Sequence, residues 1–243
     1  MFSGNHETLD ELRGYDLCIA QPRDGYRFSL DPLLLCAFPG AGVVGRAIDL
    51  GTGSGVIPLI LARQSDSATV VGVEVQEEMA ALAERNVRLN GLTDRVEIVC
   101  ADILSLRDRY PVSSFDLVIA NPPYRTPESG RISPKTGRDR ARHETTATLK
   151  DFLETAKYLV RPAGTIAFTY LPVRLAEFCV TAAGLKLALL RIRMVHGYAQ
   201  ASARMALIGL AKGRRAELEV LPPLFVYGAD GEYSEEVKRI LRV

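Results

Sequence analysis

The residues Asn121-Pro122-Pro123-Tyr124 follow directly on the apolar run 117–120. The side-chain oxygen of Asn121 and the carbonyl of Pro122 are two acceptors, and a planar N–H₂ group carries two donors. The prolines fix φ and have no N–H to compete, so they would hold the acceptors in place. Tyr124 adds a ring face on which a flat group can stack. The motif predicts a rigid notch for a planar amino group; a plain strand-ending turn is the alternative.

A glycine-rich stretch, "DLGTGSG", occupies residues 49–55 between an apolar run and a helical pattern. Gly51, Gly53 and Gly55 allow positive φ and close approach of the backbone to a ligand. The amides at the start of the following helix favour an anion such as a carboxylate. A simple tight turn would have a similar composition, so the loop alone is weak support for a binding site.

Acidic residues end the next two predicted strands. Glu74 closes "ATVVGVEV", where an acid can accept hydrogen bonds from ribose hydroxyls, and Asp102 closes "VEIVCAD". Asp102 precedes "ILSL", so capping of a helix is its alternative role. The G-x-G-x-x-G spacing of dinucleotide sites is missing, and so is the P-loop pattern. The expected ligand therefore contains a ribose but is neither a dinucleotide nor a nucleoside triphosphate held by a P-loop.

The elements that position these residues alternate between strand and helix, which predicts an α/β fold with a mostly parallel, twisted sheet. Two successive strand patterns, 187–196 and 204–213, predict an antiparallel C-terminal edge. The patterns expected as parallel strands are 45–50, 68–75, 96–102, 115–120 and 164–171. Helices are expected over 56–65, 76–92, 151–160 and 174–184.

The first forty residues are expected to form a short extension, 1–40, on a core of 41–243 within one domain. A short strand from residue 16, a turn at Gly25 and a second short strand precede a helix starting near Asp31. Asp31 would be its N-cap and Pro32 its first helical residue.

Composition limits the function classes. The 243 residues are 47% hydrophobic and 24% charged with a net charge of +1, so any nucleic-acid affinity must come from local clusters. Four cysteines show no C-x-x-C spacing, which argues against a zinc site, and no metal is expected. No stretch reaches the roughly 18 apolar residues of a membrane span. The polar, acidic N-terminus is unlike a signal peptide, and a cytoplasmic location is expected.

Four motifs, which are "DLGTGSG", "VVGVEV", "CADIL" and "NPPY" in this order along the chain, resemble those of class I S-adenosylmethionine-dependent methyltransferases. The resemblance covers most of residues 44–170. The resemblance implies a Rossmann-like fold and S-adenosylmethionine as cofactor. It implies that the acid before the glycine loop orders that loop, that the second-strand acid holds the ribose and that the third-strand acid contacts the adenine. The residues it places in the cofactor site are Asp49, Gly51, Thr52, Gly53, Gly55, Glu74, Asp102 and Asn121. Asn121, Pro122 and Tyr124 are expected to be catalytic.

N-P-P-Y motifs are shared by enzymes that act on adenine N6, on guanine N2 and on a glutamine of release factors. Release-factor enzymes usually carry a large N-terminal helical domain, for which about forty residues leave too little room. DNA adenine enzymes usually add a target-recognition domain, which this length does not accommodate. An RNA-binding protein on a degenerate scaffold would have damaged motifs, and a nicotinamide oxidoreductase would need a different glycine loop.

A basic segment directly after the motif favours a phosphate backbone as partner, although a solvated loop would look alike. With Pro123 and Tyr124, the substrate-binding residues expected there are Arg125, Arg131, Lys135, Arg138, Arg140 and Arg142. A second cluster could flank the same site and comprises Lys186, Arg191, Arg193, Arg204, Lys212, Arg214 and Arg215.

The N-terminal stretch "QPRDGYRFSLDPLLLCAF" and the later "HETTATLKDFLETAKYLVRPAGTIAFTY" resemble the bacterial tRNA1(Val) adenine-N6 methyltransferases. That resemblance covers nearly the whole chain and implies methylation of adenine 37 in a tRNA anticodon loop. Such a base is unpaired, so its extrusion costs little. A glutamine methyltransferase and an rRNA base N-methyltransferase remain the alternatives, and the oligomeric state is open.

Overall fold

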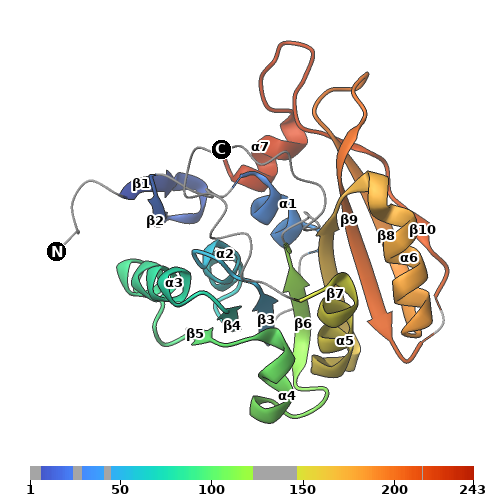
Figure 1. Cartoon of the computed structure of the whole chain (residues 1–243). Helices are drawn as coiled ribbons and strands as arrows, with labels where there is room; N and C mark the ends of the chain where they lie inside the picture. The colour runs from blue at the N-terminus through green and yellow to red at the C-terminus, as the bar shows by residue number, and fades with distance from the viewer. Residues whose placement is uncertain (1–6, 24–28, 41–44, 123–146, 215) are drawn as a thin grey trace, which may run out of the picture.

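The computed structural model describes residues 7–23, 29–40, 45–122, 147–214 and 216–243 (Figure 1). Its centre is a nine-stranded sheet in the order β10-β8-β9-β7-β6-β3-β4-β5, with β11 also paired to β8. Strands β3 to β7 run parallel, as their composition predicts, because apolar residues face both sides of the sheet. Their bounds are β3 Arg46–Leu50, β4 Thr69–Glu74, β5 Val96–Cys100, β6 Phe115–Ala120 and β7 Val160–Tyr170.

The C-terminal edge is antiparallel, which confirms the predicted mixed sheet. β9 (Ala203–Lys212) pairs antiparallel with β7 and with β8 (Leu187–His196). Two short strands that sequence patterns do not reveal, β10 (Glu219–Val220) and β11 (Leu224–Phe225), lie parallel to β8. The β8–β9 hairpin therefore runs the length of the sheet, with its turn beyond the carboxyl ends of the parallel strands.

Helices cover both faces of the sheet, so the fold has three layers. One face packs against α1 (Asp31–Ala37), α2 (Val56–Gln64), α3 (Glu77–Leu89) and α7 (Glu235–Leu241). The other packs against α4 (Leu106–Arg109), α5 (Leu149–Leu159) and α6 (Leu175–Gly184). The strand–helix alternation in the sequence is thus confirmed as a doubly covered parallel sheet.

The N-terminal extension differs from its prediction. β2 (Leu17–Pro22) pairs with the preceding β1 (Glu7–Leu12), a strand that the sequence did not predict, and most of the second strand expected after Gly25 lies outside the described residues. β1 was not predicted, because its residues are half-exposed and largely polar and so show no apolar strand pattern. Helix α1 begins one residue away from the expected cap, with Leu30 as N-cap and Asp31 as its first residue.

Asn86 of α3 and Asn90, the C-cap of that helix, attach this N-terminal hairpin to the core. Asn90 donates to the carbonyl of Cys18 and accepts from its N–H, each at 2.8 Å. Asn86 pairs with both backbone groups of Ala20 and also donates to the carbonyl of Ser54 at 2.9 Å. Because the two amides are one helical turn apart, they replace a neighbouring strand for the free edge of β2.

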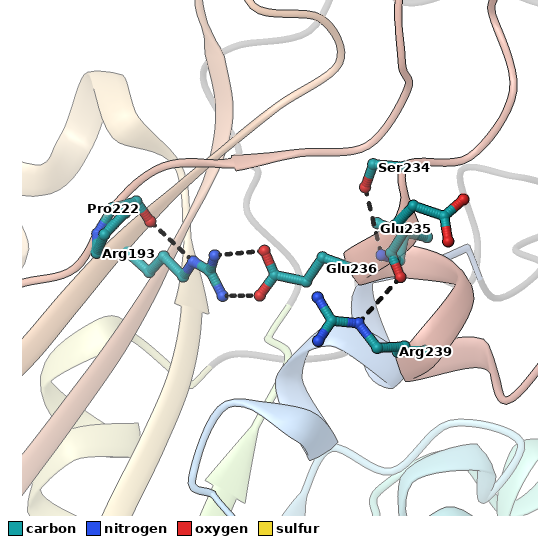
Figure 2. Close-up of polar contacts among 7 residues, drawn as sticks. Arg193, Pro222, Ser234, Glu235, Glu236 and Arg239 are labelled. Atoms are coloured by element: carbon teal, nitrogen blue, oxygen red, sulfur yellow. Dashed lines mark hydrogen bonds and ion pairs between the residues drawn. The ribbon is translucent and has the colours of Figure 1, made fainter.

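The C-terminal helix α7 joins distant parts of the chain. The hydroxyl of Tyr15 donates to the carbonyl of Ile240 at 2.7 Å. Figure 2 shows Arg193 reaching from β8 to α7, where both ends of its guanidinium donate to the Glu236 carboxylate at 2.7 and 2.8 Å. Hydrogen bonding to Arg193 lowers the pKa of Glu236 below its ordinary value. Within the described residues no helix is both long and apolar enough to cross a membrane.

Candidate cofactor and methyl-acceptor site

The glycine loop after β3 adopts a conformation that depends on its glycines. Gly51, Gly53 and Gly55 have φ of 80°, 56° and 82°, a region that L-residues with side chains rarely occupy. The N–H groups of Gly51 and Thr52 donate to the carbonyl of Val73 at 2.9 and 2.8 Å, which fastens the loop to β4. The loop leads directly into α2, so the free amides of the helix start face the carboxyl edge of the sheet.

Glu74 connects the end of β4 to this loop. One carboxylate oxygen accepts from the N–H of Gly53 at 2.9 Å, and the other accepts from the N–H of Gln76 at 3.0 Å. Each oxygen keeps a lone pair beyond these bonds. Glu74 can therefore order the glycine loop and still accept hydrogen bonds from a ribose diol.

Asp49, expected to order the glycine loop, makes no hydrogen bond to that loop among the described residues, so this role stays a prediction. Its side chain is fully buried, and neither carboxylate oxygen accepts a hydrogen bond from the residues that the structure describes. Burial raises the pKa of Asp49 to about 7, and the Glu74 carboxylate adds to the rise. The nearby Thr52 hydroxyl acts in the opposite direction and lowers the pKa of Asp49, but it is not in hydrogen-bonding geometry with the carboxylate. Among the described contacts, the carboxylate that orders the loop is that of Glu74.

Asp102 lies at the same edge after β5 and caps a short helix. One of its carboxylate oxygens accepts from the N–H of Leu104 at 2.9 Å. Its backbone carbonyl also accepts from the hydroxyl of Ser105 at 2.8 Å. The capping alternative is therefore observed, and contact with an adenine remains a prediction for its half-exposed side chain.

Asn121 and Pro122 end β6, which lies between β3 and β7. The side-chain oxygen of Asn121 accepts from the hydroxyl of Thr169 at 2.5 Å. Thr169 is fully buried in β7, where the pairing of Ala120 with Phe168 places it beside Asn121. This bond orients the amide, and a carbonyl oxygen can accept more than one hydrogen bond.

Most of the predicted acceptor-side residues lie outside the described residues. These are Pro123, Tyr124, Arg125, Arg131, Lys135, Arg138, Arg140 and Arg142. The structure brings together the glycine loop, Glu74, Asp102 and Asn121 at one edge of the sheet, which the strand order predicts.

The second basic cluster does not form one surface at this edge. The β8–β9 hairpin spans the sheet, so Lys212 and the neighbouring Lys186 lie at the opposite, amino edge. Lys212 donates there to the Ser113 hydroxyl at 2.9 Å. Arg193 is paired with Glu236, and the guanidinium of Arg191 donates to a backbone carbonyl. Clustering in sequence was therefore a wrong guide to clustering in space.

Two residues that the sequence interpretation missed support the site. Thr169 was overlooked because a threonine in a strand is common; its signal was a hydroxyl inside the apolar run "IAFTYL". Gly72 in β4 leaves room for the loop, because a Cβ there would lie 2.9 Å from both the Thr52 hydroxyl and the Ile98 side chain. Its signal was a lone glycine inside the strand pattern "VVGVEV".

Comparisons with known proteins agree with this geometry. The family model of the methyltransferase small domain matches residues 31–137. A tRNA1(Val) (adenine(37)-N6)-methyltransferase of Porphyromonas gingivalis is 30% identical over 88% of this chain and 86% of its own length. The protein of the same name from Erwinia tasmaniensis is 35% identical over 60% of this chain and 59% of its own. The crystal structure of a predicted O-methyltransferase from Agrobacterium tumefaciens has a TM-score of 0.71 at 23% identity, covering 86% of this chain and 94% of that one.

A sheet of this order, with a glycine loop and an acidic strand end at its carboxyl edge and methyltransferases as its relatives, defines a class I S-adenosylmethionine-dependent methyltransferase. The glycine loop and the free lone pairs of Glu74 fit this cofactor. The likeness to the Porphyromonas protein extends over nearly the whole chain. The chain therefore belongs to the tRNA1(Val) (adenine(37)-N6)-methyltransferase family.

Proposed function

We propose that this enzyme methylates N6 of adenine 37 in a tRNA anticodon loop, in the cytoplasm. The observation that carries the proposal is the position of Asn121. It follows β6, which pairs directly with β3, the strand before the glycine loop, and its amide accepts a hydrogen bond from Thr169 in β7. An amino group held there would lie next to the cofactor loop. The names of the relatives supply the nucleotide and the RNA.

The residues of the notch would act on the two N–H groups of the target. The lone pair of an exocyclic amine is delocalised into its ring, which makes the nitrogen a poor nucleophile. Hydrogen bonds from its two N–H groups to fixed acceptors favour a geometry in which the lone pair is localised on nitrogen. Asn121 Oδ1 and the Pro122 carbonyl can accept these two N–H groups and orient the lone pair. The bound cofactor supplies a methyl group activated by its sulfonium, so in-line placement is the main requirement.

The basic segment after the motif would bind the phosphates next to the target. Unpaired loop nucleotides can be splayed out and stacked on aromatic side chains, and Tyr124 is expected to supply such a face. Residues 125–142 lie outside the described part of the chain, so their support comes from sequence alone.

An assay with tritiated S-adenosylmethionine tests the proposal. The substrates are a tRNA1(Val) transcript, the same transcript with guanine at position 37, ribosomal RNA and a release factor. Label on the first transcript alone, recovered as N6-methyladenosine by nucleoside mass spectrometry, is the expected result. Label on the release factor or ribosomal RNA would favour the glutamine or rRNA alternative and contradict the proposal.

Asn121→Ala tests the notch directly. Loss of one preorganised polar group at a site of developing charge is expected to lower the single-turnover rate about 10²- to 10³-fold. Urea unfolding serves as the control for folding, because Asn121 is itself expected in the cofactor site. A rate within about threefold of wild type at saturating RNA and cofactor would contradict the acceptor role.

A further inference from the structure

Three tyrosines, here called the tyrosine stack, meet between the β8–β9 turn and the segment after β11. The ring centroids of Tyr198 and Tyr227 are 5.2 Å apart, and their planes are tilted by 30°. Those of Tyr227 and Tyr233 are 5.5 Å apart, with planes inclined by 10°. Tyr198 and Tyr233, the outer members, keep 46% and 38% of their surface exposed. Each therefore has a ring face turned away from Tyr227.

Backbone hydrogen bonds fix the position of the stack. The N–H of Tyr227 donates to the carbonyl of Gly197 at 2.9 Å, and Tyr227 and Tyr233 form an isolated antiparallel bridge. Beneath the stack, the N–H of Val226 donates to the carbonyl of His196 at 2.8 Å. Rings held on paired backbone lose little freedom when another flat group stacks on them.

The stack stands on the same edge of the sheet as Asn121. Tyr170, at the end of β7, pairs with Ala206, and β9 begins three residues earlier, so the β8–β9 turn rises about 10 Å beyond that edge. Three strand spacings, about 15 Å, separate β8 from β6. Figure 1 shows this turn and the loop before α7 projecting on the side where β6 ends. Nucleotides adjacent to a base held at Asn121 could reach the stack.

Charges around the stack favour bases over phosphates. Arg204 is exposed at the start of β9, while Asp230 and Glu232 are exposed in the loop between Tyr227 and Tyr233. These three charges sum to −1, so the described surface around the stack has no excess of cations for a phosphate backbone, and its affinity for RNA would come from the ring faces. Aromatic faces bind bases whatever their sequence, because every base has a π-face.

We propose that the tyrosine stack is a platform for unpaired bases of the RNA that flank the methylated nucleotide. This inference rests on the proposed function, since it needs an RNA substrate at Asn121. It assigns substrate binding to described residues far from the motif in sequence. The platform would hold neighbours of the target while that base enters the notch.

Binding of labelled tRNA1(Val) by fluorescence anisotropy tests the platform. The double variant Tyr198→Ala/Tyr233→Ala is expected to bind about 5- to 100-fold more weakly, the cost of losing stacked bases. Tyr198→Phe/Tyr233→Phe keeps the faces and should bind within about twofold of wild type. Val180→Ala, on an α6 side chain that is 73% exposed, is the matched surface control. Because no charge is removed, the salt dependence of binding should not change.

A second substrate isolates the stacking. In a tRNA whose anticodon-loop nucleotides flanking position 37 are abasic, wild type should bind as weakly as the alanine double variant, and the variant should lose nothing further. If the alanine variant folds, binds cofactor and still binds intact tRNA like wild type, the stack only fastens the turn to the loop and the inference is wrong. If wild type neither binds nor methylates any tRNA, the proposed function itself fails, and the inference falls with it.

Discussion

Thr169 and Asn121 show how a buried hydroxyl can set the geometry of an acceptor. The Thr169 hydroxyl has no route to a substrate, because its side chain is fully buried in β7. Its bond to Asn121 nevertheless decides which way the amide points. Thr169 is therefore a positioning residue in the proposed reaction, and its effect should appear in the rate of methyl transfer.

Thr169→Val keeps the shape of the side chain but removes the hydroxyl. We expect methyl transfer to slow about three- to tenfold, the rate equivalent of one hydrogen bond. Thr169→Ser should restore the rate, and cofactor affinity should match wild type in both variants. Single-turnover kinetics at saturating substrates measure this. A valine variant as fast as wild type, with the serine variant no different, would remove Thr169 from the mechanism.

Asp49 should make the stability of the cofactor-free enzyme depend on pH. Its pKa is about 7 in the folded protein against an ordinary 3.8. Between these values the folded state keeps a proton that the unfolded state has lost, so the free energy of unfolding falls as pH rises, by about 1.4 kcal/mol per pH unit. Below pH 3.8 both states are protonated, and above about 7 the fall is complete.

Asp49→Asn removes this titration. Urea unfolding at pH 5 and pH 7 should show the wild type losing about 2–3 kcal/mol relative to the variant. Any other groups that titrate in the same range occur in both proteins and cancel in the comparison. Parallel pH profiles for the two proteins would mean that Asp49 is ionised, and solvated or paired, throughout.

At the scale of the element, Gly72 in β4 leaves the space that Thr52 of the glycine loop occupies. Gly72→Ala would place a Cβ 2.9 Å from Thr52 Oγ1, closer than real contacts allow, so the loop must shift. We expect a loss of about 1–3 kcal/mol in stability and a weaker affinity for S-adenosylmethionine. Calorimetry measures the affinity, and urea unfolding the stability. Gly184→Ala, whose Cβ would meet nothing within 4 Å, is the matched control. Equal cofactor affinity in wild type and Gly72→Ala would show that the loop tolerates the shift.

The elements around the cofactor could be predicted because their signals are local. Apolar runs bounded by glycines predicted the parallel strands. Because the carboxyl ends of parallel strands share one edge of the sheet, the acids that follow these strands were expected to lie together there. The helix expected over 76–92 is observed as α3, whose last helical residue is Leu89, just before the Asn90-Gly91 pair. Local patterns are reliable here because β3, β4 and β6 are buried on both faces and tolerate few polar residues.

The rest depended on contacts between distant residues. Strand β1 pairs along only one edge, so a polar sequence suffices, and nothing local distinguishes it from a loop. Helix α7 was missed although Ser234 caps it and acids fill its first turn, which is a recognisable start signal. The positions of Thr169 and of the tyrosine stack follow from strand register, which no single segment of sequence determines.

For the whole molecule, a net charge of +1 means that RNA affinity depends on where the cations lie. Replacing Arg138, Arg140 and Arg142 with glutamine should weaken tRNA binding and reduce the slope of log K against log salt by about two to three. Binding titrations from low to high salt measure the slope, and cofactor affinity should not change. The same charge change at exposed Arg107, Arg109 and Lys186 should leave the slope nearly unaltered. Matching slopes for both triple variants would mean that residues 138–142 do not bind phosphate.

The contact between Tyr15 and Ile240 has a consequence for the order of events during synthesis. The two residues are 225 positions apart, so the hydroxyl of Tyr15 has no partner in α7 until residue 240 has left the ribosome. The sheet and its cofactor loop can assemble earlier, because their strands lie within a shorter stretch. The N-terminal hairpin can dock on α3 at that stage, but the face that α7 covers stays open. A nascent chain arrested before residue 235 should therefore bind S-adenosylmethionine while still exposing an apolar surface to chaperones.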